Sequence, residues 1–210
     1  MQLFVGRNAF EGDIARYAAR FNLLEVKADA ANLPRGARLS DWRKKVPADF
    51  AFSVVLPRAV GKLETSSIEL GRTLEVAEAL SAKWILLQTP SVVGPSSRMR
   101  ERLAKVFEAV AKEDRRIAWE SRGVWEDEQI EEFAAEHDVT VVRDVSMAVP
   151  PLGGEVVYSR LLALGDGAQV RSSTATLVAE AIADFEEAFV VIEGQGAEGA
   201  AKVLRQELTP

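Results

Sequence analysis

Short apolar segments alternate with amphipathic segments along most of the chain. Eight apolar segments have the length of a β-strand and are rich in β-branched or aromatic residues. They comprise residues 3–6, 23–27, 50–57, 84–90, 116–121, 139–144, 156–162 and 188–194. Several are apolar at successive rather than alternate positions, which is typical of strands whose two faces are both buried. The pattern therefore predicts short strands in a buried sheet.

Most of the segments between these strands have a helical pattern. Apolar residues recur there at intervals of three and four positions, with charged residues between them. The predicted helices cover residues 12–21, 67–82, 96–113, 126–137, 176–187 and 197–208. Two connections differ. The helix between the second and third strands is short and centred on residues 40–46, and residues 146–155 contain two adjacent prolines and are predicted to form a loop.

The repeated order of strand and helix predicts parallel βαβ units. Eight such strands close a (β/α)₈ TIM-like barrel, so we expect one α/β barrel domain over residues 1–210, smaller than the typical length of about 250 residues. A doubly wound open sheet is the alternative. That fold usually has a glycine-rich phosphate loop after its first strand, and the segment VGRNAFEG matches neither common form of that loop.

Composition restricts the classes of function. The net charge of −6 disfavours binding to nucleic acid or to an anionic membrane, because both are themselves negative. The chain has no cysteine, which excludes disulfides, thiolate metal sites and thiol nucleophiles. No apolar run approaches the roughly 20 residues that span a bilayer, and no signal peptide is visible. We therefore expect a soluble cytoplasmic protein, with its oligomeric state left open.

Polar residues end most of the predicted strands. In a TIM barrel the active site lies at the carboxyl ends of the strands, so these residues are the candidates for function. They are Glu25, Lys27, Arg58, Gln88, Glu120, Arg122, Asp144, Arg160 and Glu193. The alternation of side chains along a strand predicts that Glu120 points inward and that Trp119 points outward, toward the helices.

Glu120 and Asp144 are the predicted catalytic residues. They end neighbouring strands, which lie about 4.8 Å apart. Two carboxylates at such a spacing repel each other, raise one pKa, or share a divalent cation, which is the one cofactor we consider. Arg122 and Arg160 are predicted to bind the phosphate or carboxylate of an anionic small molecule through their planar guanidinium groups.

Other predicted ligand-binding residues complete the lining of this site. They are Glu25, Gln88, Trp125 and Glu193. Trp125 either stacks on a ligand or packs at the start of its helix. A structural alternative applies to the whole set, because strands end where solvent begins and charged residues there form ion pairs, such as one between Glu120 and Arg160.

Two further features bear on the chemistry. Glycines in residues 193–201 follow the last strand and begin the last helix, where backbone amides bind anions; a flexible loop is the alternative. His137 is the only histidine, at the end of a predicted helix, where it interacts favourably with the helix dipole. A Ser-His-Asp triad and a histidine-rich zinc site are therefore excluded.

Several segments together resemble a known family. The most specific is the pattern Glu-x-Arg-x-x-Trp at Glu120, Arg122 and Trp125, within IAWESRGVW. The other matching segments are YAARFNLLEV, DWRKKVPADFAFSVVLPR, LLQTPS, VTVVRD, VYSRL and AEGAAKVL. Over residues 17–208 the chain is similar to the YecE-like family, known as domain of unknown function 72. The resemblance implies a barrel fold with polar residues at Glu25, Gln88, Asp144 and Arg160, and it implies no particular reaction.

The chain also departs from that family's pattern. Val55 replaces a lysine, Leu162 replaces a histidine, and Ile192, Glu193 and Gly194 replace Phe-Asn-Asn. The resemblance thus implies a divergent member whose activity is lost or changed. The leading hypothesis is an enzyme acting on an anionic small molecule at the carboxyl ends of the strands. The alternatives are a catalytically degenerate barrel that binds a ligand or a protein, and metal-assisted phosphodiester hydrolysis.

Overall fold

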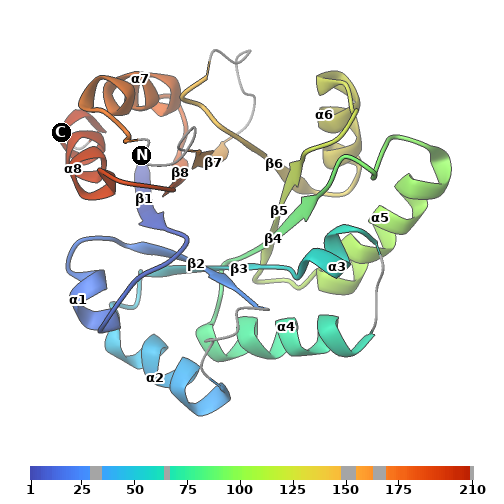
Figure 1. Cartoon of the computed structure of the whole chain (residues 1–210), viewed down its shortest axis with the longest axis horizontal. Helices are drawn as coiled ribbons and strands as arrows, with labels where there is room; N and C mark the ends of the chain where they lie inside the picture. Colours follow the sequence, from blue (N-terminus) through green and yellow to red (C-terminus); the bar gives the residue numbers. More distant parts are fainter. Residues whose placement is uncertain (29–34, 64–66, 148–154, 163–168, 209–210) are drawn as a thin grey trace. The chain divides into compact units, whose positions relative to one another are not determined.

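The computed structural model describes residues 1–28, 35–63, 67–147, 155–162 and 169–208 of the chain. Within these residues, parallel strands form a closed barrel in the order β1 to β8. The strands, labelled in Figure 1, are β1 (Gln2–Arg7), β2 (Leu23–Lys27), β3 (Ala51–Val55), β4 (Trp84–Thr89), β5 (Arg116–Ser121), β6 (Val139–Arg143), β7 (Val156–Leu161) and β8 (Glu187–Ile192). The predicted TIM-like barrel is therefore confirmed.

Helices follow most of the strands. They are α1 (Ile14–Ala18), α2 (Gly36–Lys45), α3 (Arg58–Gly61), α4 (Ser67–Leu80), α5 (Ser97–Val110), α6 (Asp127–Glu136), α7 (Ser172–Ile182) and α8 (Ala197–Leu208). None of them, over the described residues, is long and apolar enough to cross a membrane.

The predicted helices differ from those of the structure most clearly at α2, α3 and α7. The helix α2 begins at Gly36 rather than near residue 40. The short helix α3 was not predicted, because its four residues are too few to show a helical period. The helix α7 begins at Ser172 rather than at residue 176, because small polar residues conceal its period there. It ends at Ile182, and Glu187, the last residue of the predicted helix, belongs to β8. Most of the predicted loop at residues 146–155 lies outside the described residues.

Contacts between residues divide the chain into two compact units. The first unit contains Met1–Glu25, Val46–Ala51 and Val142–Pro210, and the second contains Val26–Lys45 and Phe52–Val141. The first unit therefore contains β1, β7 and β8 with their helices, and the second contains β4 and β5. The expectation of a single domain stays a prediction.

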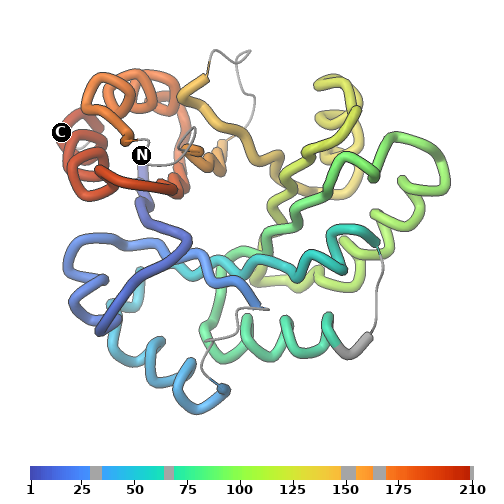
Figure 2. Tube along the Cα trace, in the orientation of Figure 1, coloured from blue at the N-terminus to red at the C-terminus, as the bar shows by residue number. Residues whose placement is uncertain are grey.

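Stacked aromatic rings form the core of the first unit. Phe4 of β1 and Phe189 of β8 are partners in the strand register, and their ring centroids lie 4.5 Å apart with almost parallel planes. Tyr158 of β7 also stacks on the β8 residue, with a centroid separation of 6.2 Å. The tube in Figure 2 shows α7 beside α8, and α8 beside the amino-terminal strand. The two ends of the chain thus pack together in this unit.

The second unit is organised around the register between β4 and β5. These strands pair over six positions, from Trp84 opposite Arg116 to Thr89 opposite Ser121. Trp119 is fully buried and packs edge-on against Phe107 of α5 and Phe133 of α6. The predicted outward direction of the Trp119 side chain is therefore confirmed, and the apolar part of β5 joins the barrel to its helices.

Candidate functional site

A buried network of charged side chains lies in the first unit, and we call it the Glu25 cluster. It contains Glu25, Tyr158, Arg160 and Glu193. Arg160 Nε donates to both carboxylate oxygens of Glu25, at 3.1 and 3.2 Å, and the Tyr158 hydroxyl donates to Oε1 at 2.8 Å. A second guanidinium nitrogen of Arg160 donates to the Glu193 carboxylate. Three of the predicted site residues, Glu25, Arg160 and Glu193, are thus brought together.

Burial governs the electrostatics of this cluster. The Glu25 side chain is completely buried and that of Arg160 is 3% exposed, whereas that of Glu193 is 28% exposed. Burial raises the pKa of the Glu25 carboxyl, while the Arg160 charge and the hydrogen bonds from Tyr158 and Arg160 oppose the increase. The Arg160 guanidinium therefore stabilises a carboxylate that has lost its solvent.

A second network follows β4 and β5 in the second unit. Gln88 Nε2 donates to Glu120 Oε2 at 2.6 Å, and Arg122 Nε donates to Glu120 Oε1 at 2.7 Å. Glu120 is 8% exposed, but the side chain of Arg122 is 52% exposed. Gln88 and Glu120 are direct partners in the strand register, which explains why they meet. The Arg122 guanidinium is thus half exposed while paired with Glu120, and its predicted role in binding an anion stays a prediction.

The helix α3 approaches the end of β4 so closely that only glycine fits at position 61. A Cβ atom on Gly61 would lie 2.1 Å from the backbone oxygen of Gln88, far inside van der Waals contact. The helix begins directly after Pro57, whose fixed φ favours the turn out of β3. This close contact holds the end of β4, and with it the Gln88 side chain.

Asp144 links the ends of β6 and β7. Its Oδ1 accepts hydrogen bonds from the backbone and hydroxyl of Ser146, and its Oδ2 accepts one from the backbone N–H of Leu162 at 3.0 Å. Both carboxylate oxygens thus stabilise local backbone geometry. Asp144 belongs to the first unit and Glu120 to the second, so the structure describes the two predicted catalytic carboxylates with separate sets of partners.

Trp125 packs within an aromatic cluster at the start of α6. Its indole N–H donates to the backbone oxygen of Val93 at 2.7 Å, and the residue is 7% exposed. Its ring contacts Trp119 edge-on at 5.1 Å and Phe133 at 5.5 Å. The same cluster includes His137, which is the C-cap of α6. Its predicted position at the end of a helix is therefore confirmed. Of the two roles predicted for Trp125, the structure describes packing.

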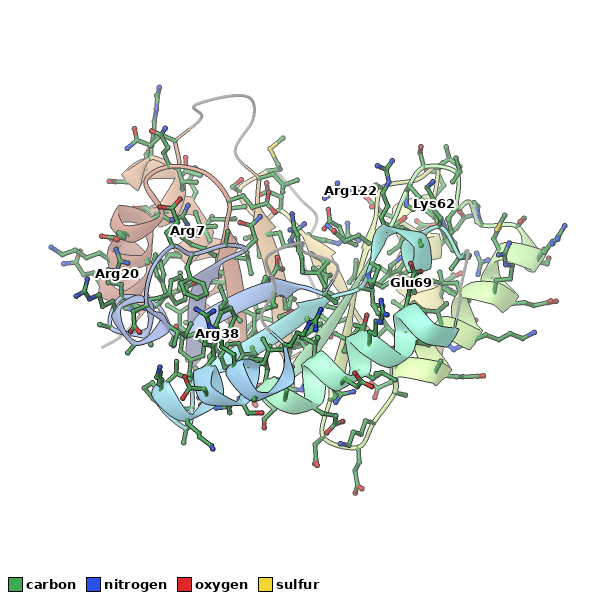
Figure 3. The ribbon with its side chains drawn as sticks, turned by 60° about the horizontal axis from the view of Figure 1, so that its bottom comes forward. Arg7, Arg20, Arg38, Lys62, Glu69 and Arg122 are labelled. Atoms are coloured by element: carbon green, nitrogen blue, oxygen red, sulfur yellow. The ribbon has the colours of Figure 1, made fainter. Side chains whose placement is uncertain are left out.

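A cleft lies at the ends of β1 and β8. The sequence indicated its glycine loop within residues 193–201 as a candidate anion site, but it did not indicate Arg7. We call this cavity the Arg7 cleft. It has a volume of about 530 Å³ and is lined by Arg7 and residues 194–199. The loop that forms its wall needs glycine, because Gly194 and Gly196 have φ values of +95° and +81°. Figure 3 labels Arg7, which ends β1 and faces this loop.

The Arg7 guanidinium has unused hydrogen-bonding capacity. Its Nε is buried and has no hydrogen-bond partner in the part of the chain that the structure describes. Its Nη2 reaches the backbone oxygen of Gly194 only at 3.5 Å, the outer limit for a hydrogen bond. The rule that polar residues at strand ends are candidates would have found Arg7, but the first predicted strand ended at Gly6.

The first turn of α8 supplies the other wall of the Arg7 cleft. The first bond within the helix runs from the Ala200 N–H to the Gly196 oxygen, so the N–H groups of Ala197, Glu198 and Gly199 have no partner inside the helix. The Glu198 carboxylate is paired with Arg20. This wall therefore presents the positive end of a helix dipole next to a guanidinium.

No group of three or more His, Cys, Asp and Glu side chains in the described ranges is arranged to hold a metal ion. The predicted divalent cation at Glu120 or Asp144 stays a prediction that rests on the oxygen chemistry of the carboxylates.

The fold and the polar strand ends define a class of protein: a small TIM-like barrel with charged groups where this fold usually binds its ligands. The chain belongs to the DUF72 family, described as proteins of unknown function, whose family pattern matches residues 6–208. The resemblance to the YecE-like family, domain of unknown function 72, is thereby confirmed. No curated protein matches the chain.

Solved structures of the same fold include two members of this family. A DUF72 family protein of Enterococcus faecalis V583 has a TM-score of 0.78 at 17% identity, covering 100% of this chain and 96% of the other. A DUF72 family protein of Thermotoga maritima MSB8 has a TM-score of 0.76 at 19% identity, covering 98% and 99%. A D-allulose 3-epimerase from Methylomonas sp. has a TM-score of 0.63 at 14% identity, covering 99% and 98%. These likenesses show the fold.

Proposed function

We propose that this DUF72 chain is an enzyme that acts on a small anionic molecule and binds its phosphate or carboxylate in the Arg7 cleft. The observation that carries the proposal is the Arg7 guanidinium, whose buried Nε has no hydrogen-bond partner in the described residues. Arg7 lines the cleft, and its Nη2 contact with the Gly194 oxygen is long at 3.5 Å, so an anion there would give this incompletely paired guanidinium a better acceptor.

The geometry of the Arg7 cleft suits an oxyanion. Arginine presents its donors in a planar fork that matches phosphate and carboxylate. Residues 197–199, at the N-terminus of α8, line the same cleft, and helix N-termini favour anions through their dipole. The volume of about 530 Å³ is in the range of sites for small ligands. The nearby Glu198 carboxylate forms a surface ion pair with Arg20, which offsets part of its repulsion of an anion.

The structural neighbours support a small, oxygen-rich substrate. The Methylomonas protein is named for a sugar, and a neighbour from Vibrio cholerae is a 3-keto-L-gulonate-6-phosphate decarboxylase, with a TM-score of 0.58 at 10% identity. Both names describe small oxygenated molecules, one of them a phosphate. A sugar phosphate or sugar acid is therefore the first class of compound to test.

The candidate acids and bases for the reaction stay those of the sequence. Glu120 and Asp144 are proposed as acid or base, or as ligands of a divalent cation. Within the second unit, Arg122, whose side chain is 52% exposed, is proposed to bind an anion, and Gln88 is proposed to orient the Glu120 carboxylate beside it. Glu25, Arg160, Glu193 and Trp125 are proposed to support the site. The buried pairing around Arg160 favours that supporting role over direct binding.

A second candidate function is a catalytically degenerate barrel that binds its ligand without turnover. The internal pairing of Arg160 with Glu25 and Glu193 favours it, because these charges satisfy one another. The two candidates share the anion site and differ in whether the bound molecule is converted.

A thermal-shift screen tests the proposal. Purified protein is heated with phosphorylated sugars, sugar acids and divalent cations, and a ligand that binds the folded state raises the melting temperature. The screen is repeated on Arg7→Gln, on Glu120→Gln and on Arg98→Gln, a matched control at an exposed position of α5. We expect shifts that Arg7→Gln abolishes and Arg98→Gln retains. Shifts of equal size in all variants would contradict the proposal, and conversion of a bound compound would distinguish the enzyme from the degenerate barrel.

A further inference from the structure

The backbone of Arg7, the residue labelled at the end of β1 in Figure 3, is held from the side of β2. The register between β1 and β8 runs from Gln2 to Gly6 and stops one residue before Arg7. The register between β1 and β2 begins at Gly6 and includes Arg7, which lies opposite Leu24. The place of the Arg7 guanidinium in the cleft therefore depends on the contact between β1 and β2.

A tyrosine hydroxyl joins these two strands at Arg7. The backbones approach so closely that a Cβ atom on Gly6 would lie 1.8 Å from the backbone oxygen of Leu23. The Tyr17 hydroxyl donates a hydrogen bond to the same Leu23 oxygen at 2.7 Å. It also accepts the backbone N–H of Arg7 at 2.8 Å. One hydroxyl thus fixes the end of β1 at the residue that brings the guanidinium to the Arg7 cleft.

The Tyr17 side chain is itself held firmly in the first unit. It is 2% exposed, and its ring stacks on Phe21 at a centroid distance of 5.0 Å and meets Phe50 edge-on at 6.2 Å. Asp13 caps the helix α1, which carries Tyr17. Burial raises the pKa of the Tyr17 hydroxyl well above its ordinary value of 10.0. The hydroxyl therefore keeps its proton at neutral pH and can donate and accept at the same time.

We propose that Tyr17 is a positioning residue, whose hydroxyl holds the backbone of Arg7 where the guanidinium can receive an anion in the Arg7 cleft. The hydroxyl is buried and bonded to two backbone groups, so it acts on the ligand through Arg7 and not by direct contact. A binding group that is ordered before the ligand arrives loses less conformational entropy on binding. The inference rests on the proposed function, because it concerns the residue that binds the anion there.

The substitution Tyr17→Phe tests this role, because it removes the hydroxyl and keeps the ring. Dissociation constants of ribose 5-phosphate are measured by NMR titration for the wild type, Tyr17→Phe, Arg7→Gln and the double variant. The matched control is Thr73→Val, which removes another buried hydroxyl, one that donates to the Glu69 oxygen within α4 in the second unit.

We expect Tyr17→Phe to weaken binding about fivefold, which corresponds to one hydrogen bond of ordinary net strength. Thr73→Val should bind as the wild type does. Adding Tyr17→Phe to Arg7→Gln should not weaken binding further, since the hydroxyl acts through the arginine. A bond that merely stabilises the fold is equally strong in the free and bound forms, so its loss lowers the stability of the protein and leaves the dissociation constant unchanged.

The outcomes separate the inference from the proposed function. Equal dissociation constants for the wild type and Tyr17→Phe, with weaker binding to Arg7→Gln, would overturn the inference and leave the anion site in place. An equal loss from Tyr17→Phe with and without Arg7, or the same loss in Thr73→Val, would also overturn it. Absence of binding to the wild type would overturn both.

Hydrogen exchange in the wild type gives a second test that does not depend on the folding of Tyr17→Phe. By linkage, a ligand that binds better to the ordered end of β1 also stabilises that order. Saturating ribose 5-phosphate should therefore slow the exchange of the Arg7 backbone N–H more than that of Val5, which is bonded to Asn22 Oδ1 at 2.8 Å. Exchange at Arg7 that slows no more than exchange at Val5 would overturn the inference.

Discussion

Arg160→Met is the substitution that most directly perturbs the Glu25 cluster. Methionine has a similar length and keeps the apolar part of the side chain packed, but it removes three hydrogen bonds that Arg160 donates to Glu25 and Glu193. Glu25, whose side chain is completely buried, keeps the hydrogen bond that the Tyr158 hydroxyl donates within the cluster. Because a buried carboxylate without its cation is strongly unfavourable, we expect the free energy of unfolding to fall by about 3–5 kcal/mol.

Protonation of Glu25 limits that loss. Removing the Arg160 charge removes the main interaction that opposes the burial-induced increase of the Glu25 pKa. The pKa of Glu25 therefore rises further. Each additional pKa unit lowers the free energy of unfolding by about 1.4 kcal/mol at neutral pH, until the carboxyl binds a proton and the loss stops growing. The double variant with Glu25→Gln has no buried charge to compensate, so we expect it to be more stable than the sum of the two single changes by about 2 kcal/mol.

Urea denaturation at pH 7, followed by circular dichroism, measures these differences. Wild type, Arg160→Met, Glu25→Gln and the double variant are compared with Arg98→Met, an exposed control that should change stability by less than about 0.5 kcal/mol. A loss below about 1 kcal/mol in Arg160→Met would refute the reasoning, because it would show that Glu25 does not depend on this guanidinium. Strict additivity in the double variant would refute the coupling.

Two further predictions concern packing and pH. Gly61→Ala should destabilise the chain by about 1–3 kcal/mol, because its Cβ would lie 2.1 Å from the Gln88 oxygen. Gly71→Ala, at an open position within α4, should stabilise the chain by about 0.5–1 kcal/mol. The midpoints of urea denaturation measure both changes, and equal effects on stability would contradict the close packing at Gly61. Burial raises the pKa of Glu25 above its ordinary value of 4.5, so the folded state binds a proton there more strongly than the unfolded state. The contribution of this carboxyl to stability is therefore present below pH 4.5 and is lost as the pH rises through the folded pKa. The difference in unfolding free energy between wild type and Glu25→Gln should fall over that interval, and a difference that is constant with pH would contradict the shift.

The barrel could be predicted because each strand carries its own signal. The segments 23–27 and 116–121 were predicted with the bounds that the structure gives, since continuous apolar runs bounded by polar residues need no information from distant parts of the chain. The outward direction of Trp119 follows from the two-residue period of a strand. Helices with small polar first turns, such as α7, were placed less well because they lack an apolar period there.

The partners within the site could not be predicted from the sequence alone. Arg160 and Glu25 are 135 residues apart, and no local pattern specifies that these two charges meet. Arg7 was missed although it ends a strand, because the apolar run before it is short and ends in glycine. Gln88 and Glu120 were both identified as strand ends, but their hydrogen bond depends on the register between β4 and β5, which only the folded chain fixes.

The central claim is that the Arg7 cleft binds an anion, and one titration tests it most directly. The dissociation constant of ribose 5-phosphate is measured by calorimetry for the wild type, Arg7→Gln and the control Arg98→Gln. We expect saturable binding to the wild type and to Arg98→Gln, and binding at least tenfold weaker to Arg7→Gln. Equal dissociation constants for all three proteins, or binding to none of them, would contradict it.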